Sequence, residues 1–234
     1  MRAEQRTPIG ALILLALLGG CAERPRSLPG DRTVAVVYVA LGDSTVEGVG
    51  ASGPEASYVS LLARRLRSVY PNARAVNLGV SGARSSDVAR TQLPRAVELA
   101  PDLITLSVGP NDITGHVSVD AYAANLVTIF EALTRQTRAA VVANLLPDLA
   151  ITPRFARGEL RDVMGRRTVA FNEALARAGQ TYGVELVDLY VASRQEVPRR
   201  PELIGADGYH PSDAGYARWA ELLWMGVERR LAAR

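Results

Sequence analysis

The chain of 234 residues is 48% hydrophobic and 22% charged, a balance typical of a globular domain that buries its own core without disulfides or metal staples. Its formal net charge is only +3, and no dense basic cluster interleaved with aromatic residues occurs, so nucleic-acid binding is not expected. One cysteine and two unclustered histidines do not provide metal-ligand spacing. No glycine-rich loop carries a P-loop lysine, and we expect neither a metal nor a cofactor.

The N-terminal residues have the pattern of a secretory signal. Arg2 and Arg6 precede an apolar run over residues 9–18, which is too short to span a bilayer of about 30 Å. The run is followed by Leu-Gly-Gly-Cys at 18–21, which resembles the lipobox of bacterial lipoproteins, in which the cysteine is lipidated. The alternative is an ordinary signal peptide followed by a chance cysteine.

This pattern divides the chain into three predicted segments: a lipoprotein signal peptide at 1–20, lipidated Cys21 with a flexible tether at 21–33, and a folded domain at 34–234. The tether is predicted from two prolines, a glycine and several charges. Ala22, and not aspartate, follows the cysteine; by resemblance to Gram-negative lipoproteins, this favours the outer membrane. The expected location is the cell envelope, lipid-anchored, on the periplasmic face of the outer membrane if the organism is Gram-negative.

Beyond the tether, short apolar runs alternate with amphipathic segments. Apolar runs too short for helices predict buried strands at 34–41, 74–78, 103–108, 139–146 and 184–189. Apolar spacings of three and four predict helices at 58–69, 118–135, 160–182 and 212–231. A further helix of about a dozen residues is predicted after Ser85 and Ser86, with Pro94 limiting or kinking it. This alternation predicts an α/β fold with a mostly parallel five-stranded sheet and helices on both faces.

Three predicted strands end in polar or glycine-bearing turns. Ser44 follows the first strand, Gly79 the second and Asn111 the third. The carboxyl ends of parallel strands lie along one edge of the sheet, where open α/β folds place their ligand crevice. We therefore expect these three residues to converge.

A serine hydroxyl is a weak nucleophile that needs an adjacent base. His210 is the candidate base, because Asp207 lies three residues earlier and can hold one ring nitrogen, which fixes the tautomer. His116 lies beyond Asn111 without a local carboxylate, and we expect it to be a surface-loop histidine.

Attack on an ester carbonyl creates an oxyanion, which needs hydrogen-bond donors already in place. The backbone N–H groups of Ser44 and Gly79 and the side-chain amide of Asn111 suit this role. Taken singly, Gly79 can be a turn glycine and Asn111 a turn cap. Their order on three successive strand ends favours a shared site.

Four blocks of the sequence resemble the SGNH (GDSL-type) hydrolase family, in order across residues 34–231. They are Gly-Asp-Ser at 42–44, Gly79 within Asn-Leu-Gly at 77–79, Gly-Pro-Asn-Asp at 109–112 and Asp-Gly-Tyr-His-Pro at 207–211. The resemblance implies a flavodoxin-like three-layer α/β/α fold and serine esterase chemistry. It makes Ser44 the nucleophile, His210 the general base and acid, Asp207 the orienting acid, and Ser44, Gly79 and Asn111 the oxyanion hole. The Gly-x-Ser-x-Gly elbow is absent, which argues against the ordinary α/β-hydrolase fold.

The expected activity is hydrolysis of carboxylic esters with short to medium acyl chains, with lysophospholipids and thioesters among the substrates that the resemblance allows. An O-acetyl esterase or acetyltransferase acting on envelope glycans would use the same acyl-serine. A non-catalytic envelope binding protein is the alternative from another class. We expect a monomer whose partners are a small-molecule or lipid ester and the membrane, through Cys21. The aperiodic loop at 149–158 is expected to shape the substrate pocket, and the sequence leaves open whether it closes as a lid.

Overall fold

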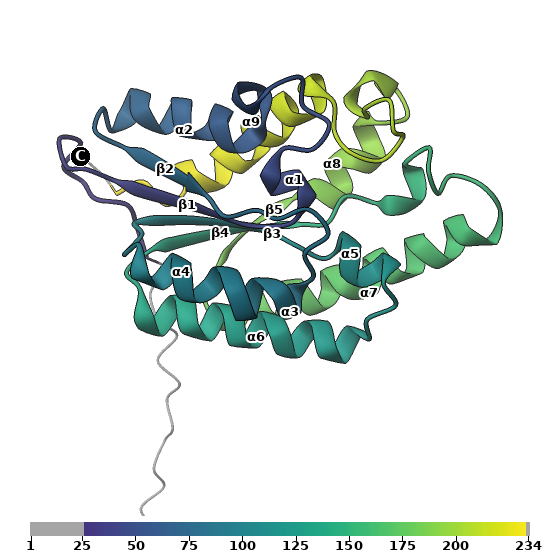
Figure 1. Cartoon of the computed structure of the whole chain (residues 1–234), viewed down its shortest axis with the longest axis horizontal. Coiled ribbons are helices and arrows are strands. Elements are labelled where there is room, and N and C mark those ends of the chain that lie inside the picture. Colours follow the sequence, from purple (N-terminus) through teal and green to yellow (C-terminus); the bar gives the residue numbers. More distant parts are fainter. Residues whose placement is uncertain (1–25, 233–234) are drawn as a thin grey trace, which may run out of the picture.

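The computed structural model describes residues 26–232, which form a twisted sheet between two layers of helices (Figure 1). All strand pairs are parallel, and the strand order is β2-β1-β3-β4-β5. The strands are β1 (Val37–Gly42), β2 (Arg74–Asn77), β3 (Leu103–Ser107), β4 (Ala140–Leu145) and β5 (Glu185–Asp188). The chain direction across the sheet reverses between β1 and β3. Such a switch point is where open α/β sheets bind ligands.

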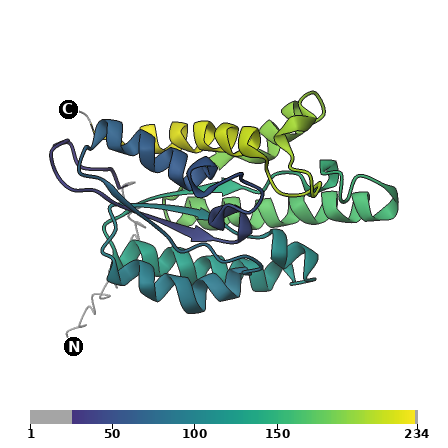
Figure 2. The ribbon, with the colours of Figure 1, turned by 45° about the horizontal axis from the view of Figure 1, so that its top comes forward.

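The helices divide between the two faces of the sheet, as the two views agree (Figures 1 and 2). One face carries α2 (Tyr58–Val69) and α9 (Asp213–Glu228), which pack on each other. The other carries α3 (Ser85–Asp87), α4 (Leu93–Glu98), α6 (Val119–Gln136) and α7 (Gly158–Thr181). Short helices follow three strands: α1 (Ser44–Glu47) after β1, α5 (Pro110–Thr114) after β3 and α8 (Leu189–Glu196) after β5. Single turns η1 (Pro54–Ala56), η2 (Val88–Gln92), η3 (Leu149–Ile151) and η4 (Pro201–Leu203) complete the elements.

Strand β1 shows how the sequence builds both cores. Successive side chains of a strand point to opposite faces. Tyr38 and Ala40 accordingly join the core cluster beneath α2 and α9, whereas Val39 and Leu41 join the cluster beneath α6 and α7. All four side chains are fully buried. Because both faces are covered, the strand reads as a continuous apolar run without polar alternation.

The predicted fold class is therefore confirmed: a five-stranded parallel sheet in a three-layer α/β arrangement. Element ends shift by a few residues. The helix expected from Ser85 is continuous to Glu98 but contains a π-helical turn, η2, immediately before Leu93 and Pro94. Helix α8 was not predicted, because it has only eight residues and buries only Leu189 among them, so it shows no repeating apolar spacing.

The beginning of the packed fold lies earlier than the sequence analysis placed it. Leu28 is 1% exposed, pairs with Leu231 in a parallel bridge, and donates its N–H to the Arg230 carbonyl at 2.6 Å. Residues 26–33 thus contact the domain, which corrects the prediction of a flexible tether for that stretch. The apolar side chain of Leu28, set among prolines and charges, was the missed signal. Residues 1–25, including Cys21, lie outside the described residues. Within 26–232, no helix has both the length and the apolar character needed to cross a bilayer.

Candidate active site

The turn between β1 and α1 carries Ser44. Gly42 ends β1 with φ of +145°, and a Cβ atom there would lie 1.9 Å from the Ser107 carbonyl oxygen. Glycine is required, because both the backbone conformation and the close contact exclude a side chain. Asp43 then caps α1: its Oδ1 accepts from the Thr45 N–H at 3.0 Å and from the Thr45 hydroxyl at 2.8 Å. Ser44, the first residue of α1, is held 6% exposed at the carboxyl edge of the sheet.

A buried glutamine, Gln92 of η2, holds this turn by two hydrogen bonds to Gly42. The Gln92 amide oxygen accepts from the Gly42 N–H, and its amide nitrogen donates to the Gly42 carbonyl, both at 2.8 Å. Gln92 is the last residue of η2, in which the Leu93 N–H reaches back to the Val88 carbonyl. Single π turns are frequent at functional sites. Sequence reasoning missed Gln92, because a glutamine within an amphipathic helix is ordinarily a surface residue.

The capping carboxylate beside Ser44 is itself buried. Asp43 is 1% exposed, and its Oδ2 has no hydrogen-bond partner among the described residues. Burial raises the pKa of Asp43 to about 6, although the hydrogen bonds from Thr45 act in the opposite direction. Asp43 therefore changes its charge near neutral pH, one residue from the serine.

The loop between η4 and α9 carries the imidazole. An isolated bridge between Ile204 and Pro211 closes the base of this loop. Within it, Asp207 Oδ1 accepts from the backbone N–H groups of Tyr209 and His210, each at 2.9 Å. These bonds hold the carboxylate and the imidazole, three residues apart, in one fixed arrangement.

Ser44, His210 and Asp207 form one chain of hydrogen bonds. Ser44 Oγ lies 2.9 Å from His210 Nε2, and His210 Nδ1 lies 2.5 Å from Asp207 Oδ2. A carboxylate can only accept from Nδ1, so Nε2 is left to accept the serine hydroxyl proton. Burial alone would raise the pKa of Asp207, but the hydrogen bonds from the His210 ring and from two backbone N–H groups outweigh it and hold the pKa below its usual value. The three residues predicted as the catalytic set are thus brought together.

The three predicted oxyanion donors are not equally free. The Ser44 N–H makes no hydrogen bond among the described residues. The Asn111 amide, in the first turn of α5, donates one hydrogen to the Ala83 carbonyl at 3.0 Å, which leaves its second hydrogen. The Gly79 N–H donates to Asn77 Oδ1 at 2.9 Å. Gly79 can therefore serve an oxyanion only by sharing or releasing that bond.

Gly79 lies directly against the helix that Ser44 begins. A Cβ atom on Gly79 would stand 2.5 Å from the Glu47 backbone nitrogen and 2.7 Å from Val46 Cβ. Asn77 fixes this contact, since its amide nitrogen donates to the Val46 carbonyl at 2.7 Å. The end of β2 therefore lies against α1, and Gly79 and Ser44 are close in space, as expected from their positions at the ends of neighbouring strands.

A second buried carboxylate, also missed from the sequence, positions α5. Asp112 is fully buried and accepts from the Ser85 N–H at 2.9 Å and from the Ser85 hydroxyl at 2.6 Å. Asn125 of α6 donates to the same hydroxyl at 2.9 Å. Burial raises the pKa of Asp112. This network ties α3, α5 and α6 together and so fixes the turn that carries Asn111.

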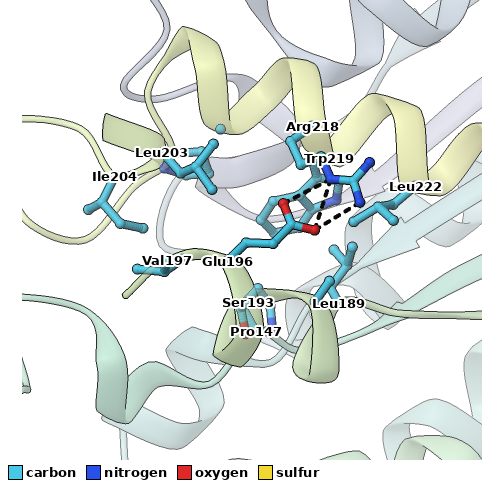
Figure 3. A pocket seen from close by; sticks show the side chains of 13 residues that line it. Pro147, Leu189, Ser193, Glu196, Val197, Leu203, Ile204, Arg218, Trp219 and Leu222 are labelled. Carbon is cyan, nitrogen blue, oxygen red and sulfur yellow. Dashed lines mark hydrogen bonds and ion pairs between the residues drawn. The ribbon is translucent and has the colours of Figure 1, made fainter. Parts of the chain in front are cut away.

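An apolar pocket of about 80 Å³ lies between α8 and α9 (Figure 3). Its lining comes from α8, from α9 with Trp219, and from the base of the His210 loop, including Pro211. Glu196 of α8 and Arg218 of α9 form an ion pair at 2.8 Å beside it. Ser44, Asp207 and His210 do not line this pocket, which reaches the His210 loop only at its base.

His116 lies where the sequence analysis expected it. It is exposed, with φ of +58° in the turn after α5. In residues 26–232, no group of three or more histidine, cysteine, aspartate or glutamate side chains is arranged to hold a metal ion.

Comparisons with known proteins agree with this fold. A sequence profile of the GDSL-like Lipase/Acylhydrolase family matches residues 40–218. A GDSL-like esterase of Mycobacterium tuberculosis is 30% identical over 220 residues, which are 92% of this chain and 68% of the relative. The solved lipase/acylhydrolase from Enterococcus faecalis superposes with a TM-score of 0.69 at 21% identity, covering 85% of this chain and 98% of its own. An acetylxylan esterase from Geobacillus stearothermophilus gives 0.66 at 21% identity, covering 86% and 97%.

The fold and the family match define the chain as a carboxylic ester hydrolase. It belongs to the GDSL-like lipase/acylhydrolase family, also called SGNH hydrolases. The structural neighbours, at 21% identity, support the fold alone.

Proposed function

We propose that this chain hydrolyses short to medium acyl esters through an acyl-Ser44 intermediate. The observation that carries the proposal is the hydrogen-bonded chain from Ser44 through His210 to Asp207, with distances of 2.9 and 2.5 Å. These are the contacts that nucleophile, base and orienting acid need.

In the first half of the reaction, Ser44 Oγ attacks the ester carbonyl carbon while His210 Nε2 takes the hydroxyl proton. The Nδ1–H remains bonded to Asp207, which stabilises the imidazolium. The Ser44 N–H and the free hydrogen of Asn111 are the oxyanion donors best placed to act, and Gly79 joins them when its bond to Asn77 is shared. His210 then returns its proton to the leaving alcohol oxygen, which releases the alcohol and leaves acyl-Ser44.

In the second half, water attacks the acyl carbon and gives a proton to His210 Nε2. His210 then returns that proton to Ser44 Oγ as the bond between Oγ and the acyl carbon breaks, which releases the carboxylic acid and restores the Ser44 hydroxyl. An O-acetyl esterase differs only in its acyl group and its glycan alcohol. An acetyltransferase differs in replacing water by an acceptor hydroxyl. Both share the same acyl-serine and are separated by product analysis.

The test is kcat/KM on p-nitrophenyl esters from acetate to palmitate, with Ser44→Ala beside the wild type. Turnover that depends on Ser44 and peaks at short to medium chains is expected. Near wild-type turnover by Ser44→Ala on every ester would overturn the acyl-Ser44 mechanism. An acylated acceptor as the main product would identify a transferase, and failure to form a covalent adduct with a fluorophosphonate probe would favour a binding protein.

We also propose that Cys21 is lipidated and anchors the domain in the cell envelope. Six residues, 22–27, separate Cys21 from the buried Leu28, a reach of about 20 Å when fully extended. Leu28 pairs with Leu231, just beyond the end of α9, whereas the His210 loop precedes the start of α9. A helix of that length spans about 24 Å, so the anchor would hold the active-site edge away from the membrane. Incorporation of an alkyne palmitate analogue, absent in Cys21→Ser, tests the lipidation; equal labelling of both would refute it.

A further inference from the structure

The segment between η3 and α7 forms a fixed wall beside the His210 loop. The Arg154 N–H donates to the Gly208 carbonyl at 3.0 Å. The Phe155 ring meets the Tyr209 ring edge to face, with centroids 5.6 Å apart. Phe155 is 8% exposed and belongs to the core cluster beneath α6 and α7. This part of the 149–158 loop is therefore anchored to the core on one side and to the His210 loop on the other.

This wall carries a cation, Arg154, that stacks on the residue beside His210. The Arg154 guanidinium carbon lies 5.2 Å from the Tyr209 ring centroid and 5.7 Å from the Phe155 ring centroid. The Tyr209 ring in turn meets the His210 imidazole edge to face, with centroids 4.9 Å apart. Arg154 is exposed, and the contacts of its guanidinium with residues between 26 and 232 are with the Tyr209 and Phe155 rings, with no ion pair or hydrogen bond among them. Two aromatic rings thus hold the guanidinium in place without neutralising it.

The position of this cation relative to His210 decides which part of a substrate meets it. His210 Nε2 must reach the leaving alcohol oxygen in order to return its proton. The alcohol portion of the ester therefore lies on the His210 side, whereas the oxyanion donors lie on the turns after β1 and β3. Arg154 stacks on Tyr209, the residue beside His210, and so stands on the alcohol side.

We propose that Arg154 is a specificity-determining residue that favours esters whose alcohol portion carries an anionic group, a carboxylate or a phosphate. The proposal rests on the proposed acyl-Ser44 chemistry. The planar fork of arginine matches both groups, which it can bind through paired N–H donors. Because the guanidinium is exposed, the gain from its charge is moderate and falls with added salt.

The first experiment compares 4-butyryloxy-3-nitrobenzoate with 4-butyryloxy-3-nitrobenzamide, which share an acyl group and differ in charge at one position. After division by the ratio of the uncatalysed rates, the wild type is expected to favour the carboxylate ester in kcat/KM by about 3- to 10-fold. Adding 0.5 M NaCl shortens the electrostatic screening length to roughly 4 Å and should reduce this preference. Arg154→Gln should lose the preference while retaining the rate on the carboxamide. Arg154→Lys should retain part of it. Arg157→Gln, which removes an exposed arginine of the same loop, is the matched control and should retain all of it.

A second pair, 1-octanoylglycerol 3-phosphate and 1-octanoylglycerol, separates the two anionic groups. Loss of a phosphate preference in Arg154→Gln alongside loss of the carboxylate preference supports a general anion site, and loss of one only assigns the site to that group. An unchanged preference in Arg154→Gln on both pairs, or an equal fall on charged and neutral esters, overturns the proposal and leaves Arg154 a structural role. Absence of any Ser44-dependent turnover on the neutral esters would instead be a failure of the proposed function.

Discussion

Replacing Gln92 by methionine tests whether the buried amide holds the Ser44 turn. Methionine has a similar volume and a flexible chain, so little packing is lost. The Gly42 carbonyl keeps its bond from the Val80 N–H at 3.1 Å, but the buried Gly42 N–H loses its acceptor. The buried Gly42 N–H, left without an acceptor, costs about 1–3 kcal/mol. The lost hydrogen bond from the Gln92 amide nitrogen to the Gly42 carbonyl costs about 0.5–1.5 kcal/mol more. We expect the free energy of unfolding to fall by about 2–4 kcal/mol.

The measurement is urea denaturation at fixed pH, with kcat on p-nitrophenyl butyrate recorded where both proteins are folded. Gln92→Glu keeps an acceptor for the Gly42 N–H but faces the Gly42 carbonyl with a second oxygen, so it should be destabilised as well. Gln180→Met is the matched control, because Gln180 is an exposed residue of α7, and it should stay within about 0.5 kcal/mol of wild type. A Gln92→Met protein within that same range, with unchanged kcat, would refute the reasoning.

Two further predictions concern the carboxylates. The pKa of Asp43 is about 6 in the folded chain and near 3.9 when unfolded, so the folded state binds more protons between these values and its stability falls as pH rises through that window. Asp43→Asn cannot ionise, and its stability relative to wild type should improve between pH 4 and pH 8 by on the order of 1–3 kcal/mol; parallel stability curves would contradict this. Asp207→Asn keeps the shape of the loop but removes the charge that selects the His210 tautomer, so kcat should fall by on the order of 10²–10⁴. Because the pKa of Asp207 is lowered in the fold, its ionised form stabilises the folded state, and the variant should also lose a modest part of its stability at pH 7; a kcat within threefold of wild type would exclude Asp207 as the orienting acid.

Much of the fold can be predicted from the sequence, because each buried strand must be apolar on both of its faces and each helix that covers the sheet must be apolar on one face. The runs ending at Gly42 and Ser107 are of this kind, and their strands lie where the pattern placed them. Helix α8 and residues 26–33 were misjudged for a common reason. In each segment a single leucine, Leu28 or Leu189, is buried against a distant part of the chain, and one buried residue leaves no periodic signal.

The candidate active site likewise contains residues that the sequence predicted and residues that it did not. Ser44, Asp207 and His210 stand in short local motifs, so their spacing along the chain carries information about their chemistry. Gln92 and Arg154 hydrogen-bond to backbone groups about 50 positions away: the Gln92 side chain bonds Gly42, and the Arg154 N–H bonds the Gly208 carbonyl. Every residue has a backbone carbonyl, and nearly every residue has a backbone N–H. The identities of the residues around Gly42 and Gly208 therefore give no sign of these hydrogen bonds. The contact can therefore be found only once the π turn of η2 and the wall at 152–155 are placed in space.

The two aspartates beside the serine and the imidazole show how environment, more than residue type, assigns their roles. Asp207 is exposed and receives the His210 ring and two backbone N–H groups, which together lower its pKa. Asp43 is buried with one oxygen unpartnered, and burial raises its pKa to about 6. Around pH 5, Asp207 therefore stays ionised while Asp43 is mostly neutral. Only Asp207 can then supply the constant negative charge that an imidazolium needs, and Asp43 is left to cap α1, because its Oδ1 still accepts from Thr45 when its other oxygen carries the proton.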